Sequence, residues 1–222
     1  AYLPTCSPNQ FQVIGQSVVC AATPGRTASG RYSDPMHANR PHHRSDLIRI
    51  ATSAMHERGL EPEFSSRVHQ QLASITHAGH ESGAEIQDLT GLLWCSIDND
   101  ESLDLDQLTV CAVQSDGAVK LLVAIADVDV LVGKGTPIDA HAHINTTSVY
   151  TSARIFPMLP ERLSTDLTSL NAGEDRLALV TEMVFNADAT LASSSVYRAL
   201  VRNKAKLAYD AVADWIEGEG RL

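Results

Sequence analysis

The spacing of apolar residues in the first half of the chain predicts two short helices. Between residues 47 and 55, Leu, Ile, Ala and Met recur every three or four positions, which is the period of an amphipathic helix. Ser45 or Asp46 is the expected N-cap, and Gly59 ends the pattern. The same spacing returns over residues 65–75 and predicts a second helix.

From residue 88 onward the pattern changes to that of β-strands. Apolar and polar positions alternate, or apolar residues follow one another, in segments bounded by turn residues. The predicted strands span residues 91–97, 108–112, 119–126, 177–185 and 191–201. Asp116-Gly117 predicts a tight hairpin turn between two of these strands. Two further helices are predicted over residues 138–145 and 204–217.

The first 44 residues show the weakest pattern. Proline and glycine interrupt this part repeatedly, and one strand is predicted over Phe11–Cys20. His37, His42 and His43 lie where apolar periodicity is absent, and solvated histidines are commoner there than metal ligands. We therefore divide the chain into a β-rich or irregular N-terminal segment (1–44), a helical connecting segment (45–87) and an α+β domain (88–222).

Composition argues against two classes of protein. A formal net charge of -10 disfavours indiscriminate binding of polyanions, because nonspecific affinity for nucleic acids comes mainly from Lys and Arg. No apolar run approaches the roughly 18 residues needed to cross a membrane, and a signal-peptide pattern is lacking. A soluble, cytoplasmic protein with no membrane partner is therefore expected. The four cysteines lack both zinc-ligand spacing and disulfide-scaffold density, so we expect them to be reduced.

The main chemical feature is an acidic segment between two apolar runs. Residues 96–108 contain five carboxylates within nine positions. They are Asp98, Asp100, Glu101, Asp104 and Asp106. Carboxylates held close together repel one another, so a folded protein keeps such a group only when protons or cations neutralise it. A hard divalent metal ion is the usual partner.

The acidic segment admits two other interpretations. The spacing of Asp98, Asp100 and Ser102 matches the first ligand positions of a calcium-binding EF-hand loop. That loop requires Gly at its sixth position and Glu at its twelfth, where this chain has Leu103 and Thr109, so we disfavour it. A hairpin corner with solvated acids is as consistent with the composition as a metal site is.

Further motifs follow the acidic segment in a fixed order. The series begins with Ile-Asp, five residues and Asp-x-Asp, over Ile97–Asp106. It continues with VAIADV at 123–128, TSVY at 147–150, FPMLPERLS at 156–164, SL at 169–170, DRL at 175–177 and KLAYD at 206–210. This series resembles the RNase II family of exoribonucleases over residues 88–222. The resemblance implies an RNB-type catalytic domain, with a mixed or antiparallel sheet and flanking helices.

The resemblance also implies a role for individual residues. Asp98 matches the acid that binds the catalytic Mg²⁺ ion. Asp104 matches a second acid that serves both catalysis and metal binding. Asp106 matches the acid most directly required for cleavage, and it is also a metal ligand. Tyr150 matches the aromatic residue that stacks on the last nucleotides at the RNA 3′ end.

The implied activity is Mg²⁺-dependent hydrolysis of single-stranded RNA in the 3′ to 5′ direction, with release of nucleoside 5′-monophosphates. A carboxylate-bound metal ion can activate water and stabilise the charge that develops during an in-line displacement. Stacking and backbone contacts can hold RNA without regard to its sequence. Arg154 and Arg176 are candidate contacts for RNA phosphates, and structural pairing with the acids is the alternative for both.

The chain departs from the family pattern at three points. The family usually has a further Asp where this chain has Gln107, an uncharged metal ligand, and often has Arg where Asn145 stands. RNB domains also continue beyond the point that matches Leu222, so residues 88–222 correspond to an incomplete domain. A catalytically impaired RNA-binding or regulatory relative is therefore an alternative, and an unrelated metal-dependent phosphoesterase is a third. The sequence predicts no oligomeric state.

Overall fold

A computed structural model describes residues 44–79 and 85–218 of the protein, which fall into two compact units. Of these residues, unit 1 comprises 44–63 and 144–158. Unit 2 comprises the described residues of 64–143 and 159–218. The predicted N-terminal strand and the three loop histidines lie outside the described residues.

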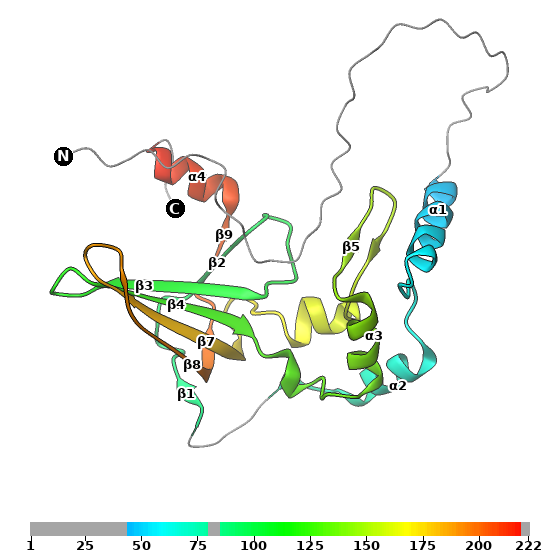
Figure 1. The fold of residues 1–222 in the computed structure, drawn as a ribbon, viewed down its shortest axis with the longest axis horizontal. Coiled ribbons are helices and arrows are strands. Elements are labelled where there is room, and N and C mark those ends of the chain that lie inside the picture. The colour runs from blue at the N-terminus through cyan, green and yellow to red at the C-terminus, as the bar shows by residue number, and fades with distance from the viewer. Residues whose placement is uncertain (1–43, 80–84, 219–222) are drawn as a thin grey trace, which may run out of the picture. The chain divides into compact units, whose positions relative to one another are not determined.

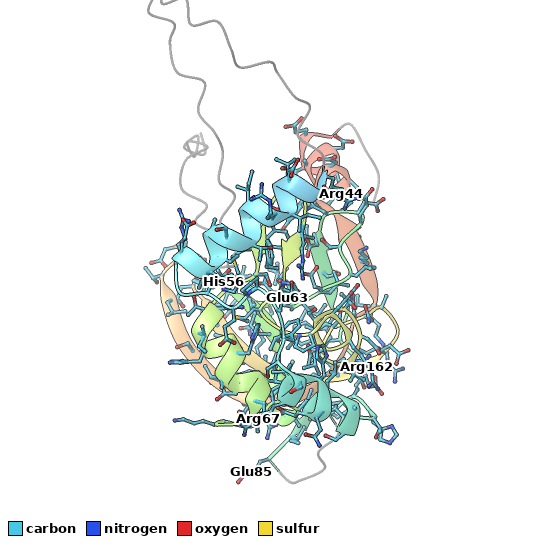
Figure 2. The ribbon with its side chains drawn as sticks, turned by 90° about the vertical axis from the view of Figure 1, so that its right-hand side faces the viewer. Arg44, His56, Glu63, Arg67, Glu85 and Arg162 are labelled. Atoms are coloured by element: carbon cyan, nitrogen blue, oxygen red, sulfur yellow. The ribbon has the colours of Figure 1, made fainter. Side chains whose placement is uncertain are left out.

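Unit 1 combines a helix with a small hairpin. Its elements are α1 (Arg44–Glu57) and the antiparallel strands β5 (Val149–Tyr150) and β6 (Ile155–Phe156). Arg44 lies at the start of α1 and His56 lies near its end (Figure 2). The predicted N-cap was wrong, because Ser45 and Asp46 already lie within the first turn. A carboxylate there is favourable, since it faces the positive end of the helix dipole.

Unit 2 is built on a seven-stranded mixed sheet. Its strands are β1 (Gln87–Asp88), β2 (Cys95–Asp98), β3 (Gln107–Val113), β4 (Val119–Ala126), β7 (Asp175–Phe185), β8 (Leu191–Arg202) and β9 (Ala205–Ala208). They are ordered β1-β8-β7-β4-β3-β2-β9. The inner strands pair antiparallel, and β1 and β9 join the two edges in parallel. The β3–β4 and β7–β8 hairpins turn at the same end of the sheet (Figure 1). The predicted α+β class with a mixed sheet is confirmed.

Helical segments complete unit 2. They are α2 (Ser66–Ser74), the 3₁₀ turn η1 (Val128–Val130), α3 (Pro137–Asn145, its last two residues in unit 1), the π-helical turn η2 (Leu163–Leu167) and α4 (Tyr209–Glu217). Ser65 caps α2, because its hydroxyl accepts a hydrogen bond from the Val68 N–H, which confirms the predicted start. The helix predicted over 204–217 was wrong in its first part. Residues 205–208 form β9 instead, since their backbone pairs with β2.

Two apolar clusters hold unit 2 together. The first lies on one face of the sheet and includes Trp94, Leu108 and Val180, all fully buried. The Trp94 indole N–H also donates to the Leu89 carbonyl at 2.9 Å, so burial leaves its polar atom satisfied. A second cluster packs α2, α3 and η2 around Ile138. The first cluster fixes the strands from which the acidic segment departs.

Two further observations concern the described ranges alone. No helix there is both long enough and apolar enough to cross a membrane. Cys95 and Cys111 carry free thiols. The thiol pKa of Cys95 is raised, mainly by burial, which keeps this group in its unreactive protonated form.

Candidate active site

The acidic segment connects β2 to β3 at one end of the sheet. Asp98 is the last residue of β2, and Asp106 directly precedes β3. The Ala126 N–H donates to the Asp106 carbonyl at 3.0 Å, so the pairing of β3 with β4 extends by one residue. Because side chains alternate along a strand, Asp98 and Asp106 lie on the same face of the sheet as Ser96 and Leu108.

Contacts with the Ser169-Leu170 pair hold the second half of this segment. The Leu105 N–H donates to Ser169 Oγ at 3.1 Å, and Ser169 Oγ lies 2.8 Å from the Leu103 carbonyl, to which it donates. The Leu170 N–H donates to the Leu105 carbonyl at 2.8 Å. The Leu105 side chain is buried in the first apolar cluster. The backbone on both sides of Asp104 is therefore fixed by the core.

One buried asparagine joins the strands that support the acids. Asn203 Nδ2 donates to Ser96 Oγ at 3.1 Å and to the Leu170 carbonyl at 3.0 Å. Its Oδ1 accepts from the Ala205 N–H at 3.1 Å. Asn203 is 1% exposed, so water cannot replace these partners. The start of β9, the middle of β2 and the Leu170 backbone therefore meet at this single side chain.

The first half of the acidic segment is a local turn. Asp98 Oδ1 accepts hydrogen bonds from the Asn99 N–H at 2.7 Å and from the Ser102 hydroxyl at 2.8 Å. Lys206 of β9 donates from Nζ to the Asp100 carbonyl at 2.6 Å. Asp100 itself is exposed to solvent.

The acids influence one another electrostatically. The pKa of Asp106 is raised, chiefly because surrounding atoms desolvate its carboxylate, and further because Asp98 and Asp104 are negatively charged. The side chain nevertheless retains access to solvent. The structure thus brings together the three acids that the motif singled out. A cation placed among them would relieve their repulsion and lower the pKa of Asp106 again.

The donor chemistry of these acids fits a magnesium ion. Carboxylate oxygens are the ligands that Mg²⁺ prefers in proteins. Within the described ranges, no group of three His, Cys, Asp or Glu side chains is already arranged to hold a metal ion. Binding would therefore require the carboxylates of Asp98, Asp104 and Asp106 to close around the ion.

Gln107 follows Asp106 directly in the chain. It is the first residue of β3 and pairs with Ile125 of β4. Strand alternation directs its side chain to the face opposite Asp106. The geometry therefore does not favour the role of metal ligand that its sequence position suggested.

Tyr209 joins the site although no motif assigned it a role. It opens α4 directly after Ala208, which pairs with Asp98 across β9 and β2. Burial raises its pKa, and the negative charges of Asp98 and Asp106 raise it further. Its phenol therefore stays protonated at neutral pH and can donate a hydrogen bond beside the acids. The KLAYD motif contained this residue, but only the parallel pairing of β9 shows where it lies.

Arg176 serves the fold of unit 2. It is 9% exposed, and its guanidinium donates to the backbone carbonyls of Asp175 at 3.0 Å and Asp166 at 3.2 Å. It also lies 3.5 Å from the Glu174 carboxylate. A side chain with these contacts braces β7 against η2. The structural alternative is thus favoured over a contact with RNA phosphates.

Tyr150 and Arg154 belong to unit 1, whereas the acids belong to unit 2. Tyr150 ends β5 and is 40% exposed, which leaves its ring accessible for stacking. Arg154 forms a two-pronged ion pair with Glu63, at 2.6 and 3.1 Å. Its guanidinium also lies 4.8 Å from the centre of the Phe156 ring. The structural alternative is favoured for this arginine too.

Comparison with known proteins identifies the family. A family model described as RNB domain matches residues 86–222. The chain belongs to the RNB domain family. The resemblance stated from the motifs is thereby confirmed. The boundaries predicted at residues 44 and 87, and the roles of the individual site residues, stay predictions.

Relatives of this RNB domain are longer proteins. Exoribonuclease 2 of Salmonella heidelberg (strain SL476) is 40% identical over 141 residues, which cover 63% of this chain and 22% of that protein. Mycoplasma genitalium RNase R, solved in complex with double-stranded RNA, has a TM-score of 0.73 at 31% identity, over 79% of this chain and 31% of its own. Yeast Ssd1, described as a pseudonuclease, shares the fold alone, with a TM-score of 0.55 at 15% identity over 65% of this chain and 18% of its own.

Proposed function

We propose that this chain carries the acidic residues of the active site of a Mg²⁺-dependent exoribonuclease. Such an enzyme hydrolyses single-stranded RNA from its 3′ end and releases nucleoside 5′-monophosphates. The observation that carries the proposal is the place of Asp98, Asp104 and Asp106 on one segment at the end of an RNB-type sheet, where Asp98 ends β2 and Asp106 directly precedes β3. The similarity to Exoribonuclease 2 supports the reaction, and the similarity to RNase R supports RNA as the partner. A cytoplasmic location is part of the same proposal.

Each site residue has a proposed task. Asp98, Asp104 and Asp106 would hold the ion, which supplies Lewis acidity toward a phosphate oxygen and a more acidic bound water. The Tyr209 hydroxyl is placed to donate a hydrogen bond to an RNA oxygen beside Asp98. Tyr150 would stack on a nucleobase near the 3′ end, a contact that every base can make. None of these contacts would read the identity of a base, so cleavage would not depend on the RNA sequence.

Removal of magnesium is expected to stop RNA degradation by the intact chain. A 5′-labelled single-stranded RNA should remain whole in excess chelator and shorten stepwise from its 3′ end once Mg²⁺ is restored. The same RNA with a blocked 3′ end should persist under both conditions. Degradation in chelator would contradict a metal-dependent reaction, and internal cuts in the blocked RNA would indicate an endonuclease.

Substitution of Gln107 is expected to leave the magnesium requirement nearly unchanged. Because strand alternation directs this side chain away from Asp106, Gln107→Ala should shift the Mg²⁺ concentration for half-maximal activity by less than about twofold. Asp104→Asn, which removes a charged ligand from the same segment, should raise that concentration by about tenfold or more. A large shift for Gln107→Ala would show that Gln107 does bind the ion.

A second candidate function is RNA retention without cleavage. Gln107 stands where the family usually has an acid, so this part of the chain has one negative charge fewer to attract a metal ion, although the Gln107 side chain is not itself directed at the ion. This lower charge favours a catalytically impaired relative. This candidate predicts that the protein retains single-stranded RNA equally with Mg²⁺ and with chelator and yields no mononucleotide in either. The degradation time course in the two conditions separates the candidates.

A further inference from the structure

The β5–β6 hairpin of unit 1 is very short. Its ladder pairs Val149 with Phe156 and Tyr150 with Ile155. Its tip is closed by Thr151, whose hydroxyl donates to the Arg154 carbonyl at 2.6 Å and accepts from the Arg154 N–H at 3.0 Å. An isolated two-stranded hairpin is marginally stable at best in water, so this ladder needs support from outside. Tyr150 stands next to the closed tip.

The outside support comes from the segment that follows α1. Arg154 Nη1 and Nη2 donate to the two carboxylate oxygens of Glu63 at 2.6 and 3.1 Å, and this fork geometry restricts both side chains. The carboxyl pKa of Glu63 is lowered, chiefly by these hydrogen bonds. The Arg154 guanidinium also lies over the ring of Phe156, which is 1% exposed. One side chain thus connects the Glu63 segment to both ends of β6.

A second contact brings the same tip toward α1. Arg44 Nε donates to the Ala153 carbonyl at 3.4 Å. Figure 2 labels Arg44 and Glu63, which lie at the start of α1 and in the segment beyond its end. These two residues approach the hairpin tip from separate parts of the chain. Contacts from two separate side chains, those of Arg44 and Glu63, therefore hold the tip.

We propose that Glu63 and Arg154 act as a positioning clamp, which fixes the β5–β6 hairpin and thereby the direction in which Tyr150 meets a nucleobase. The RNA part of this inference rests on the proposed function. Arg154 is then a positioning residue rather than a phosphate contact. Tyr150 pairs with Ile155, the residue after Arg154, so movement of Arg154 passes to Tyr150 through one backbone pair.

Amide hydrogen exchange of the full chain without RNA tests the clamp itself. Glu63→Gln should speed exchange in residues 149–156 by about threefold to fivefold, as expected for losing an exposed, well-aligned ion pair. Asp175→Asn is the matched control, because Asp175 and Arg202 form a similar two-pronged pair in unit 2, at 2.6 and 2.8 Å. It should leave the hairpin unchanged. Unchanged exchange in Glu63→Gln, or equal acceleration in both variants, would overturn the clamp.

A double-mutant cycle tests whether the clamp acts through Tyr150. A single-stranded RNA with 2-aminopurine at its 3′ end reports base stacking by fluorescence, in chelator so that no hydrolysis intervenes. Glu63→Gln should weaken the stacked complex by about threefold in the wild-type background and by less than about 1.5-fold in Tyr150→Ala. The exchanged pair Glu63→Arg with Arg154→Glu should recover part of the loss. Equal losses in both backgrounds would show a merely structural role.

Steady-state kinetics of RNA hydrolysis separate an effect of the clamp from an effect on the metal site. With Mg²⁺ and unmodified RNA, Glu63→Gln should raise KM by about threefold and leave kcat within about twofold, because the clamp affects binding rather than the metal site. A fall in kcat with KM unchanged would contradict positioning through Tyr150. If the wild-type chain releases no nucleotide, the proposed hydrolysis fails, whereas the exchange and stacking experiments still decide the clamp.

Discussion

Replacing Asp106 with Asn is expected to lower the rate of RNA hydrolysis by at least about a hundredfold, which is usual when a group that acts on transition-state charge is removed. Asn keeps the size of the side chain but removes the charge that Asp98 and Asp104 oppose. Folding should therefore be preserved or slightly improved. RNA affinity in chelator should stay within about threefold, because stacking and backbone contacts do not involve this charge. Release of mononucleotide and fluorescence anisotropy measure the two effects.

Asp100→Asn is the matched control for this experiment. Asp100 belongs to the same acidic segment, but its side chain is exposed, and the segment uses its backbone carbonyl for the contact with Lys206. Hydrolysis by this variant should stay within about twofold of wild type. Similar losses in both variants would mean that the segment acts through overall negative charge. Normal turnover by Asp106→Asn would remove the exoribonuclease assignment.

Replacing Asn203 with Ala is expected to lower the free energy of unfolding by about 2–4 kcal/mol, because it removes the Asn203 partner of the buried Ser96 hydroxyl and Leu170 carbonyl and of the half-buried Ala205 N–H. For a chain of this size the loss corresponds to a fall in Tm of about 5–15 °C. Hydrolysis should fall as well, even below the new Tm, because the same side chain aligns β2 and the backbone that flanks Asp104. Calorimetry and initial rates measure the two effects.

Asn186→Ala is the matched control for Asn203. Asn186 is exposed at the β7–β8 turn, where its amide donates to Thr190 Oγ1 at 2.9 Å. Loss of this solvated contact should change the free energy of unfolding by about 0.5 kcal/mol or less. If Asn203→Ala lowered the free energy of unfolding no more than Asn186→Ala does, the Asn203 amide would not stabilise the contact between β2, β9 and the Leu170 backbone.

Local sequence pattern predicted much of the sheet. The apolar run at 119–126 coincides with β4, although only the face that carries Leu122 and Ala124 is buried and Ile125 on the other face is 42% exposed. The failure at residues 205–208 has a physical cause. Lys206, Leu207 and their neighbours suit a helix by composition, but pairing with β2 satisfies their backbone groups in a strand. Such pairing joins residues about a hundred positions apart and cannot be read from local spacing.

In the candidate site, too, residues close together in the sequence could be predicted, whereas contacts between distant segments could not. The motif located Asp98, Asp104 and Asp106 because all three lie within one short segment. It could not locate Tyr209, which reaches Asp98 through the parallel register of β9. It also could not show that Arg154 and Arg176 are engaged by Glu63 and by backbone carbonyls. The charge of an arginine does not show whether it binds RNA phosphates or stabilises the fold.

The two halves of the acidic segment should differ in how they accept changes of chain length. Asn99–Ser102 forms a turn held by short-range hydrogen bonds, of which the Ser102 N–H to the Asn99 carbonyl is one at 3.0 Å. Extra residues inserted there would lengthen a surface loop at small entropic cost. One residue inserted between Leu103 and Asp106 would disturb the hydrogen bonds of Leu103 and Leu105 with Ser169. It would also change the direction in which the Asp104 or Asp106 side chain points. Insertions should therefore be tolerated better within Asn99–Ser102 than between Leu103 and Asp106.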